Sequence, residues 1–267
     1  MHCCPTLKIT GIVCVLVFVL TACQKELSGD SAAPGGCQLT KVTYYDSSMS
    51  VDDSAGLVYT NNQINRVNAK DYYFTFRYTS SRVSRINYFD NTNTYLDVFD
   101  SVTYNSSGKI QSVIFYSTTS GVDYPVGGYL LTYNSDGTIG KVIEEGSSGT
   151  PGSLADAYEY DYTWLQGNIT KVTITDLSTS LQFPLIYTYD ATSSYYKKYP
   201  AEFIFADTYM FGITGYQFGE LGPFLLSNNN VASVNGLPVT FDKDSNGNLT
   251  ALKVSGKTQA TYAYKCQ

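Results

Sequence analysis

The sequence predicts an all-β protein, an antiparallel meander of tandem hairpins that curls into a barrel-like structure or a sandwich. Nearly the same eleven residues occur twice, as TYNSSGKIQSV at 103–113 and TYNSDGTIGKV at 132–142. Several segments alternate aromatic and polar residues with the period of two that is typical of strands. Beyond residue 22, no segment carries the apolar period of an amphipathic helix. Because helices are not expected to cover its aromatic face, the sheet must fold over itself.

Residues 1–22 have the features of a secretory signal peptide. Lys8 precedes an apolar run over residues 12–20, which is too short to span a bilayer comfortably. The run ends in Leu20-Thr21-Ala22-Cys23, which resembles the bacterial lipobox. That resemblance implies a diacylglycerol on the Cys23 sulfur and cleavage before this residue. The alternative is an ordinary secretory signal with an incidental cysteine.

The residues after the lipobox indicate a location and a tether. Gln24-Lys25-Glu26 resembles the export signal of surface-displayed lipoproteins of the Bacteroidota. This resemblance implies a lipid-anchored protein of the cell outer membrane that faces the exterior. Residues 27–36 are small, polar and rich in Gly and Pro, as in a flexible linker. The expected organisation is a signal peptide at 1–22, a lipidated Cys23 with its tether at 23–36, and one β domain at 37–267.

Two cysteines remain after processing and lipidation, Cys37 and Cys266. One begins the predicted β domain, and the other is the penultimate residue of the chain. In an oxidising compartment such a pair is expected to form a disulfide; the alternative is two free thiols. A disulfide would link the first strand to the last.

The repeated unit has the chemistry of a β-hairpin. An aromatic residue ends the incoming strand, a polar turn follows, and Ile, Val or Leu begins the outgoing strand. In the clearest copies Asn or Asp takes the first turn position and Gly follows three residues later, as a type I turn with a following left-handed residue prefers. The copies are 59–64, 78–83, 104–110, 133–139, 162–169 (with a longer turn) and 241–249, and 226–231 is a weaker relative.

The spacing after each turn predicts a β-bulge. The first apolar residue is followed by another three residues later, as in Ile110 and Val113 or Ile139 and Val142. Residues three apart in a regular strand face opposite sides of the sheet. An extra residue beside the turn glycine would return both to one face. We therefore predict bulges in several hairpins.

The incoming strands divide into an aromatic and a polar face. In YYFTFRY (72–78) one side carries Tyr72, Phe74, Phe76 and Tyr78, and in YEYDYTW (158–164) one side carries Tyr158, Tyr160, Tyr162 and Trp164. Arg77, Glu159 and Asp161 are among the residues on the other side. The aromatic side is the expected interior.

The motif Tyr-Asn-x-x-Gly-x-Ile resembles the Tyr-Asp repeats of RHS-type shells. With the lipobox, the tandem tyrosine-rich hairpins are similar to Bacteroidota surface lipoproteins of unknown function that have a porin-like β fold. The resemblance covers most of residues 39–264. It implies a fold and a cellular location, but no activity. RHS shells are far longer than this chain, so a toxin-enclosing shell is not implied.

Composition excludes several classes of function. The only histidine, His2, leaves with the signal peptide, which removes Ser-His-Asp and Cys-His catalysis and the commonest zinc and iron ligand sets. Loss of Lys8 takes the net charge from −6 to about −7. The longest basic run is Lys197-Lys198, so we expect no nucleic-acid partner.

One segment resembles a metal site at its start only. Asp242-x-Asp244-x-Asn246-Gly247 begins like an EF-hand loop, but Lys253 stands at the twelfth position, where a bidentate glutamate is needed. We expect a hairpin turn there, with no metal and no cofactor.

Aromatic rings are the candidate ligand contacts, because Tyr and Trp offer a flat apolar face with a polar group. Trp164, beside the irregular turn, is the leading candidate for stacking on a sugar; core packing is the alternative for these rings. Residues 195–225 interrupt the repeat, and irregular insertions often carry binding surfaces; a long crossover or a divergent strand pair is the alternative. The candidates in this segment are Tyr195, Tyr196, Tyr209 and Phe211.

We expect a non-enzymatic binding or structural module at the cell surface, with a glycan or a surface protein as ligand. One alternative is an integral outer-membrane barrel, although the polar outward positions do not form a lipid-facing band. Another is a glycoside hydrolase with paired carboxylates. Its available glutamates are Glu144, Glu145, Glu159, Glu202 and Glu220, and no spacing among them singles out an acid and a partner. Glu144 and Glu145 are adjacent and are expected on opposite faces of a strand.

Overall fold

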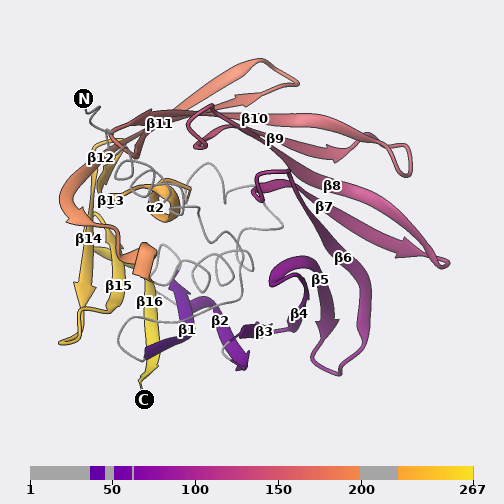
Figure 1. Ribbon diagram of the computed structural model, residues 1–267, viewed down its shortest axis with the longest axis horizontal. Coiled ribbons are helices and arrows are strands. Elements are labelled where there is room, and N and C mark those ends of the chain that lie inside the picture. The colour runs from indigo at the N-terminus through magenta and orange to yellow at the C-terminus, as the bar shows by residue number, and fades with distance from the viewer. Residues whose placement is uncertain (1–36, 46–50, 62, 199–221, 267) are drawn as a thin grey trace, which may run out of the picture.

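The computed structural model describes residues 37–45, 51–61, 63–198 and 222–266, which form a closed antiparallel barrel of sixteen strands (Figure 1). Each strand pairs with its neighbours in sequence, and the first strand pairs with the last. The predicted meander of tandem hairpins is confirmed, and it forms a barrel rather than a sandwich. The strands are β1 (Cys37–Tyr45), β2 (Val51–Thr60), β3 (Gln63–Asn68), β4 (Tyr72–Thr79), β5 (Arg82–Asp90), β6 (Tyr95–Tyr104), β7 (Ile110–Thr119), β8 (Val122–Tyr133), β9 (Ile139–Ser147), β10 (Leu154–Leu165), β11 (Asn168–Asp176), β12 (Leu181–Ser193), β13 (Asn229–Val234), β14 (Leu237–Lys243), β15 (Leu249–Val254) and β16 (Lys257–Cys266).

Two short helices, η1 (Tyr195–Lys198) and α2 (Gly222–Leu226), lie in the connection from β12 to β13. The segment 195–225 is thus a long connection at its described ends. No helix in the described ranges is long and apolar enough to cross a membrane.

The barrel closes at a covalent seam. Cys37 of β1 stands directly opposite Cys266 of β16, and the two form a disulfide across a Cα–Cα distance of 3.9 Å. The predicted link between the first and last strands is confirmed. From the disulfide onward, β1 and β16 remain paired, for example between Val42 and Tyr262.

A bulge follows the turn in all six repeat hairpins. In β6–β7, Tyr104 pairs with Ile110 but Thr103 pairs with Ser112, which leaves Gln111 as the extra residue. The bulge lies one residue after the apolar residue, not beside the turn glycine as predicted. It returns Ile110 and Val113 to the same face. The corresponding extra residues are Asn65, Ser84, Gly140, Thr170 and Thr250.

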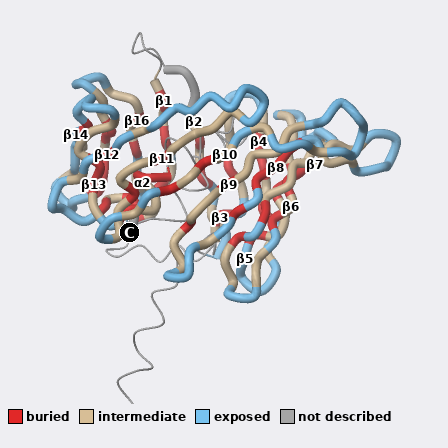
Figure 2. Tube along the Cα trace, turned by 90° about the horizontal axis from the view of Figure 1, so that it is seen from above, coloured by how far each residue is buried: buried red, intermediate tan, exposed pale blue. Residues whose placement is uncertain are grey.

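The inward side chains form one apolar cluster to which every strand contributes. Leu39, Phe74, Tyr129 and Val142 are among its almost fully buried members. Figure 2 shows this burial along the strands and the exposure of the hairpin loops. The expected aromatic interior is therefore present.

An aromatic ladder connects successive hairpins. In the β6–β7 hairpin, the Tyr104 hydroxyl donates to the carbonyl of Val83, the first apolar residue of the preceding unit, at 2.8 Å. The Tyr133 hydroxyl donates to Ile110 in the same way at 2.8 Å. Each unit is thus tied to the one before it. The aromatic ladder consists of Tyr59, Tyr78, Tyr104, Tyr133, Trp164 and Tyr189.

Two of the proposed repeat boundaries need correction. In the fifth copy Trp164, not Tyr162, pairs with Ile169, and the turn is a short one between Leu165 and Asn168. In the sixth copy Lys243, not Phe241, pairs with Leu249.

The repeat turns gather at one end of the barrel, which we call the turn end. Connections alternate between the two ends of an antiparallel meander, so the β2–β3 and β4–β5 turns lie on the same side as the β6–β7 turn. The start of β1 and the end of β16 lie there too. The disulfide and the β12–β13 connection therefore share this end.

Candidate binding surface

Trp164 uses its polar group within the barrel. Its Nε1 donates to the carbonyl of Ile139 at 2.7 Å, and its half-buried ring packs against the core. It thus takes the place that tyrosine has in the other members of the aromatic ladder. Ligand contact by Trp164 stays a prediction.

The two tyrosines of η1 also pack inward. The Tyr196 hydroxyl lies 2.9 Å from that of Tyr262, and its ring meets Phe224 edge-on at 6.1 Å between centroids. Tyr195 is half-buried and contacts Phe241 edge-on at 5.5 Å. Tyr196 is buried, and its ring contacts Phe224 of α2 as well as Phe241 and Tyr262 of the barrel wall.

The remaining predicted residues lie outside the described part of the chain. They are Cys23, Tyr209, Phe211, Glu202 and Glu220, and their assigned roles stay predictions.

The segment that begins like an EF-hand is a hairpin turn. The Asp244 carboxylate accepts the backbone N–H groups of Asn246 and Asn248, each at 2.8 Å. Lys253 forms an ion pair with Asp242 at 2.6 Å. Among the described residues, no three His, Cys, Asp or Glu side chains form a group that would hold a metal ion.

Two carboxyl groups on the inner wall accept hydrogen bonds from tyrosines. Tyr88 donates to Asp100 at 2.7 Å, and Tyr160 donates to Glu144 at 2.6 Å. Burial raises the pKa of Asp100 to about 7, although the bond from Tyr88 offsets part of this rise. Glu145 pairs with Asp156 on the outer wall, so the adjacent glutamates do face opposite sides.

The outer wall carries a feature that the sequence analysis did not single out. All four arginines of the chain occur between residues 66 and 85. Their strand positions alternate with those of the buried core, which places them on the outside of β3, β4 and β5. We call Arg66, Arg77, Arg82 and Arg85 the arginine face.

A repeated Arg-x-Asn motif fixes two of these side chains. The Arg66 Nε donates to Asn68 at 2.5 Å, and the Arg85 Nε donates to Asn87 at 2.8 Å. Each asparagine pairs across the sheet with an aromatic residue, Asn68 with Tyr73 and Asn87 with Phe99. The asparagine therefore holds the guanidinium above the ring of the next strand.

The guanidinium groups cover the rings below them. The Arg66 Cζ lies 3.5 Å from the Tyr73 ring centroid, and the Arg85 Cζ lies 3.3 Å from that of Phe99. Phe99 is in turn stacked on Tyr116, with centroids 4.8 Å apart. Tyr73 and Phe99 are consequently buried on the outer wall, at 7% and 5% exposure. Such stacking orients a guanidinium before any ligand arrives.

The positive charge of the arginine face is not neutralised within the described ranges. The ion pairs found there involve Lys141 and Lys253, and none involves an arginine. Arg77 and Arg85 stand directly opposite each other, an arrangement of like charges that destabilises a sheet. A local conflict of this kind is expected where a surface serves binding.

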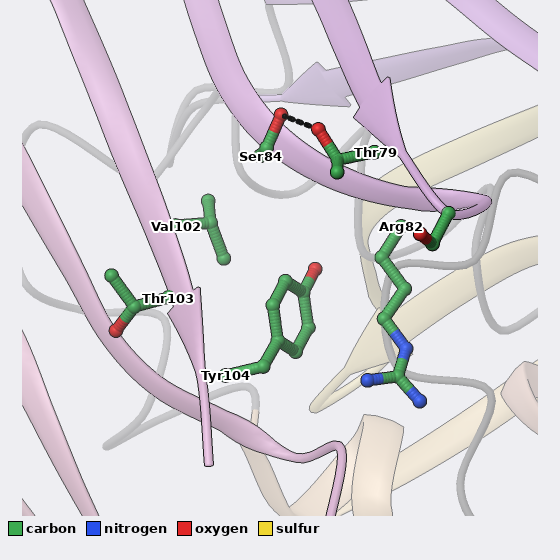
Figure 3. A pocket seen from close by; sticks show the side chains of 7 residues that line it. Thr79, Arg82, Ser84, Val102, Thr103 and Tyr104 are labelled. Carbon is green, nitrogen blue, oxygen red and sulfur yellow. Dashed lines mark hydrogen bonds between the residues drawn. The ribbon is translucent and has the colours of Figure 1, made fainter. Parts of the chain in front are cut away.

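A pocket of about 520 Å³ adjoins this face at the turn end. The β4–β5 hairpin contributes Thr79, Ser80, Arg82 and Ser84, and the end of β6 contributes Val102, Thr103 and Tyr104. Figure 3 shows Arg82 and Tyr104 facing each other across it, with Thr79 and Ser84 joined by a hydrogen bond of 3.0 Å. The Arg82 Cζ lies 5.3 Å from the Tyr104 ring centroid. One cation and several hydroxyl groups suit an anionic, hydroxylated ligand.

No family model matches the chain, and no curated protein matches it. Among solved structures, the chain is similar to a porin-like protein from Bacteroides uniformis ATCC 8492, with 11% identity, a TM-score of 0.44, and coverage of 87% of this chain and 98% of that one. It is also similar to a porin-like protein from Bacteroides vulgatus ATCC 8482, with 13% identity, a TM-score of 0.46, and coverage of 86% and 98%. A third similar structure is TcdB2-TccC3-TEV, with 16% identity, a TM-score of 0.34, and coverage of 79% of this chain and 11% of that one.

Proposed function

We propose that the chain is a non-enzymatic binding module, held at the exterior of the cell outer membrane by a lipid on Cys23, whose ligand contacts the arginine face. The observation that carries this proposal is the positive charge on the outer wall of β3, β4 and β5. The inward side chains of the barrel form an apolar and aromatic cluster that surrounds Asp100 and Glu144, and its outer wall presents arginines without ion-pair partners in the described ranges. A water-exposed wall of this kind is free to bind a glycan or a protein.

The anchor is supported by the lipobox that ends at Cys23 and by the tether at 27–36. The Cys37–Cys266 disulfide supports a site outside the cytoplasm. Because Cys37 lies at the turn end, the tether would hold the barrel by that end.

An integral outer-membrane barrel is the second candidate, since a closed antiparallel barrel is the β architecture that crosses membranes. The outer wall opposes it. Lys141 on β9 forms ion pairs with Glu159 and Asp161 on β10, at 2.8 and 3.6 Å. Charged residues facing lipid at mid-depth cost about 2–4 kcal/mol each for Lys and Arg. The lipid-anchored arrangement avoids this cost.

A carboxylate hydrolase is opposed by the partners of its acids. Asp100 and Glu144 on the inner wall each accept a hydrogen bond from a tyrosine. Glu145 and Glu159 face the other side. This arrangement favours a binding role over glycoside hydrolysis.

Insertion of a protease site after residue 30 tests the anchor in the full-length protein. We expect cleavage of isolated outer membranes to release the whole barrel into the supernatant without detergent. An integral barrel would stay in the membrane pellet after cleavage, and that result would overturn the proposal.

The lipid and the orientation are tested separately. Cys23→Ala should abolish labelling of the protein by radioactive palmitate. Protease added to intact cells should degrade the wild-type barrel if the barrel faces the exterior.

A further inference from the structure

We infer that the arginine face binds an acidic polysaccharide, a linear glycan with carboxylate or sulfate groups along its length. This inference rests on the proposed binding function and specifies its ligand. It follows from the spacing of the four charges, from the hydroxyl groups between them and from the covered state of the nearby rings.

The charges are spaced along the surface and do not converge on a single anion-binding site. Arg77 and Arg85 are cross-strand neighbours, and Arg66 pairs with Thr75, two residues from Arg77. Arg82 pairs with Thr79, two residues from Arg77 in the other direction. Neighbouring strands and alternate residues of one strand lie roughly 5 to 7 Å apart. An array with this spacing suits a ligand with repeated charges better than one small anion.

The surface between the charges is hydroxylated. Thr75 and Thr79 flank Arg77 on β4, and Ser84, Ser101 and Thr103 continue the outer wall toward β6. The pocket beside Arg82 is lined by the same kind of group. A sugar chain offers alternating hydroxyl and acidic groups, which these side chains match.

The same surface disfavours nucleic acid and membrane. Single-stranded nucleic acid needs open rings for base stacking, whereas Tyr73 and Phe99 lie beneath guanidinium groups. A membrane would meet the turn end, where the turns also carry Asp136 and Asp244. The arginines on the side wall are thus better placed for a chain that lies along the barrel.

Binding of defined polymers to the mature protein, purified from membranes in nonionic detergent, tests the inference. The probes are polygalacturonate for carboxylates, dextran sulfate for sulfates and uncharged dextran. We expect one or both acidic polymers to bind, with affinity that falls as salt is raised. Arg77→Gln/Arg82→Gln should weaken binding at least about tenfold, since two charge-assisted contacts are lost. These two side chains are exposed, so the variant is expected to fold.

The matched control is Lys171→Gln/Lys257→Gln, which removes the same charge from outside the arginine face and should change affinity less than twofold. Equal losses in both variants would overturn the inference, because they would indicate attraction by net charge. Binding of neutral dextran alone would overturn it and leave the proposed function standing. Equal or tighter binding of an oligodeoxythymidine, or of vesicles with anionic phospholipid, would also overturn it, as would failure to bind either acidic polymer.

Discussion

At the scale of single residues, the ring hydroxyls of the aromatic ladder join hairpins that are separate in sequence. The Tyr133 hydroxyl reaches 23 residues back to the carbonyl of Ile110. The hydroxyl group of tyrosine is needed there as well as its ring, because a buried carbonyl without a hydrogen-bond donor costs free energy. The many tyrosines of the chain therefore follow in part from repetition of this one contact.

Tyr133→Phe is expected to lower the free energy of unfolding by about 1 kcal/mol, since the ring remains but its hydrogen bond is lost. Urea unfolding followed by tyrosine fluorescence measures the change. Tyr124→Phe removes a hydroxyl from the same strand outside the aromatic ladder and should be nearly neutral. Equal effects of the two substitutions would contradict the role assigned to the Tyr133 hydroxyl.

Asp100 is expected to make stability depend on pH. Its pKa is about 7 in the folded protein, against an ordinary value of 3.8. The folded state therefore keeps its proton over a range in which the unfolded state loses it. The free energy of unfolding should fall as the pH rises from about 4 to about 7, by at most about 4 kcal/mol.

Asp100→Asn removes the titrating group and should flatten this part of the stability curve, with higher stability than wild type at pH 8. Thermal unfolding at pH 4.5, 6 and 8 measures it. A variant that keeps the wild-type slope would show that another group causes the dependence. Asp123→Asn, at an exposed position of β8, serves as the comparison.

At the scale of elements, the bulge after each turn decides which side chains face the core. In β7, Gln111 is the extra residue between Ile110 and Val113. The strand continues with its apolar residues inward only because this residue is present. The same device occurs in each repeat hairpin.

Deletion of Gln111 is therefore expected to prevent folding of the barrel, since every later residue of β7 would change faces. Circular dichroism and resistance to proteolysis report the result. Gln111→Ala keeps the register and should change stability by no more than about 0.5 kcal/mol. A well-folded deletion variant would show that β7 tolerates either register.

The hairpins and bulges were predictable from sequence because turn residues and apolar spacing act locally. The residues that begin and end each repeat were less predictable. Trp164 and Tyr162 are both aromatic and share a face, so the sequence does not distinguish which one ends the strand. Tyr189 was missed as a ladder member because a long connection, not a short turn, follows its strand.

At the scale of the whole molecule, closure of the sheet depends on a contact between the two ends of the chain. A sandwich and a barrel share the same local alternation, so the sequence left both open. The arginine face was also missed, because its members are not a continuous basic run. Four arginines within twenty residues, with Arg-x-Asn written twice, were the available signal. Because side chains alternate between the two faces of a strand, arginines with this spacing all lie on the outer face of the sheet.

The disulfide is expected to stabilise the barrel strongly. Cys37→Ala/Cys266→Ala should lower the free energy of unfolding by up to roughly 5 kcal/mol, the chain-entropy limit for a loop of this length. The β1–β16 pairing should persist in the variant. Urea unfolding with and without reductant measures the loss in wild type, and reductant should have no effect on the variant. An unchanged wild-type midpoint under reduction would contradict the expectation.

The pairing of β1 with β16 also means that the barrel cannot close before its last strand is available. A chain that is synthesised from its N-terminus exposes β1 first, while its partner is the last strand to arrive. Until then an incomplete ribbon presents two open strand edges to other chains. Maturation thus ends with the final dozen residues, and a nascent protein truncated before them would be left without closure and prone to self-association.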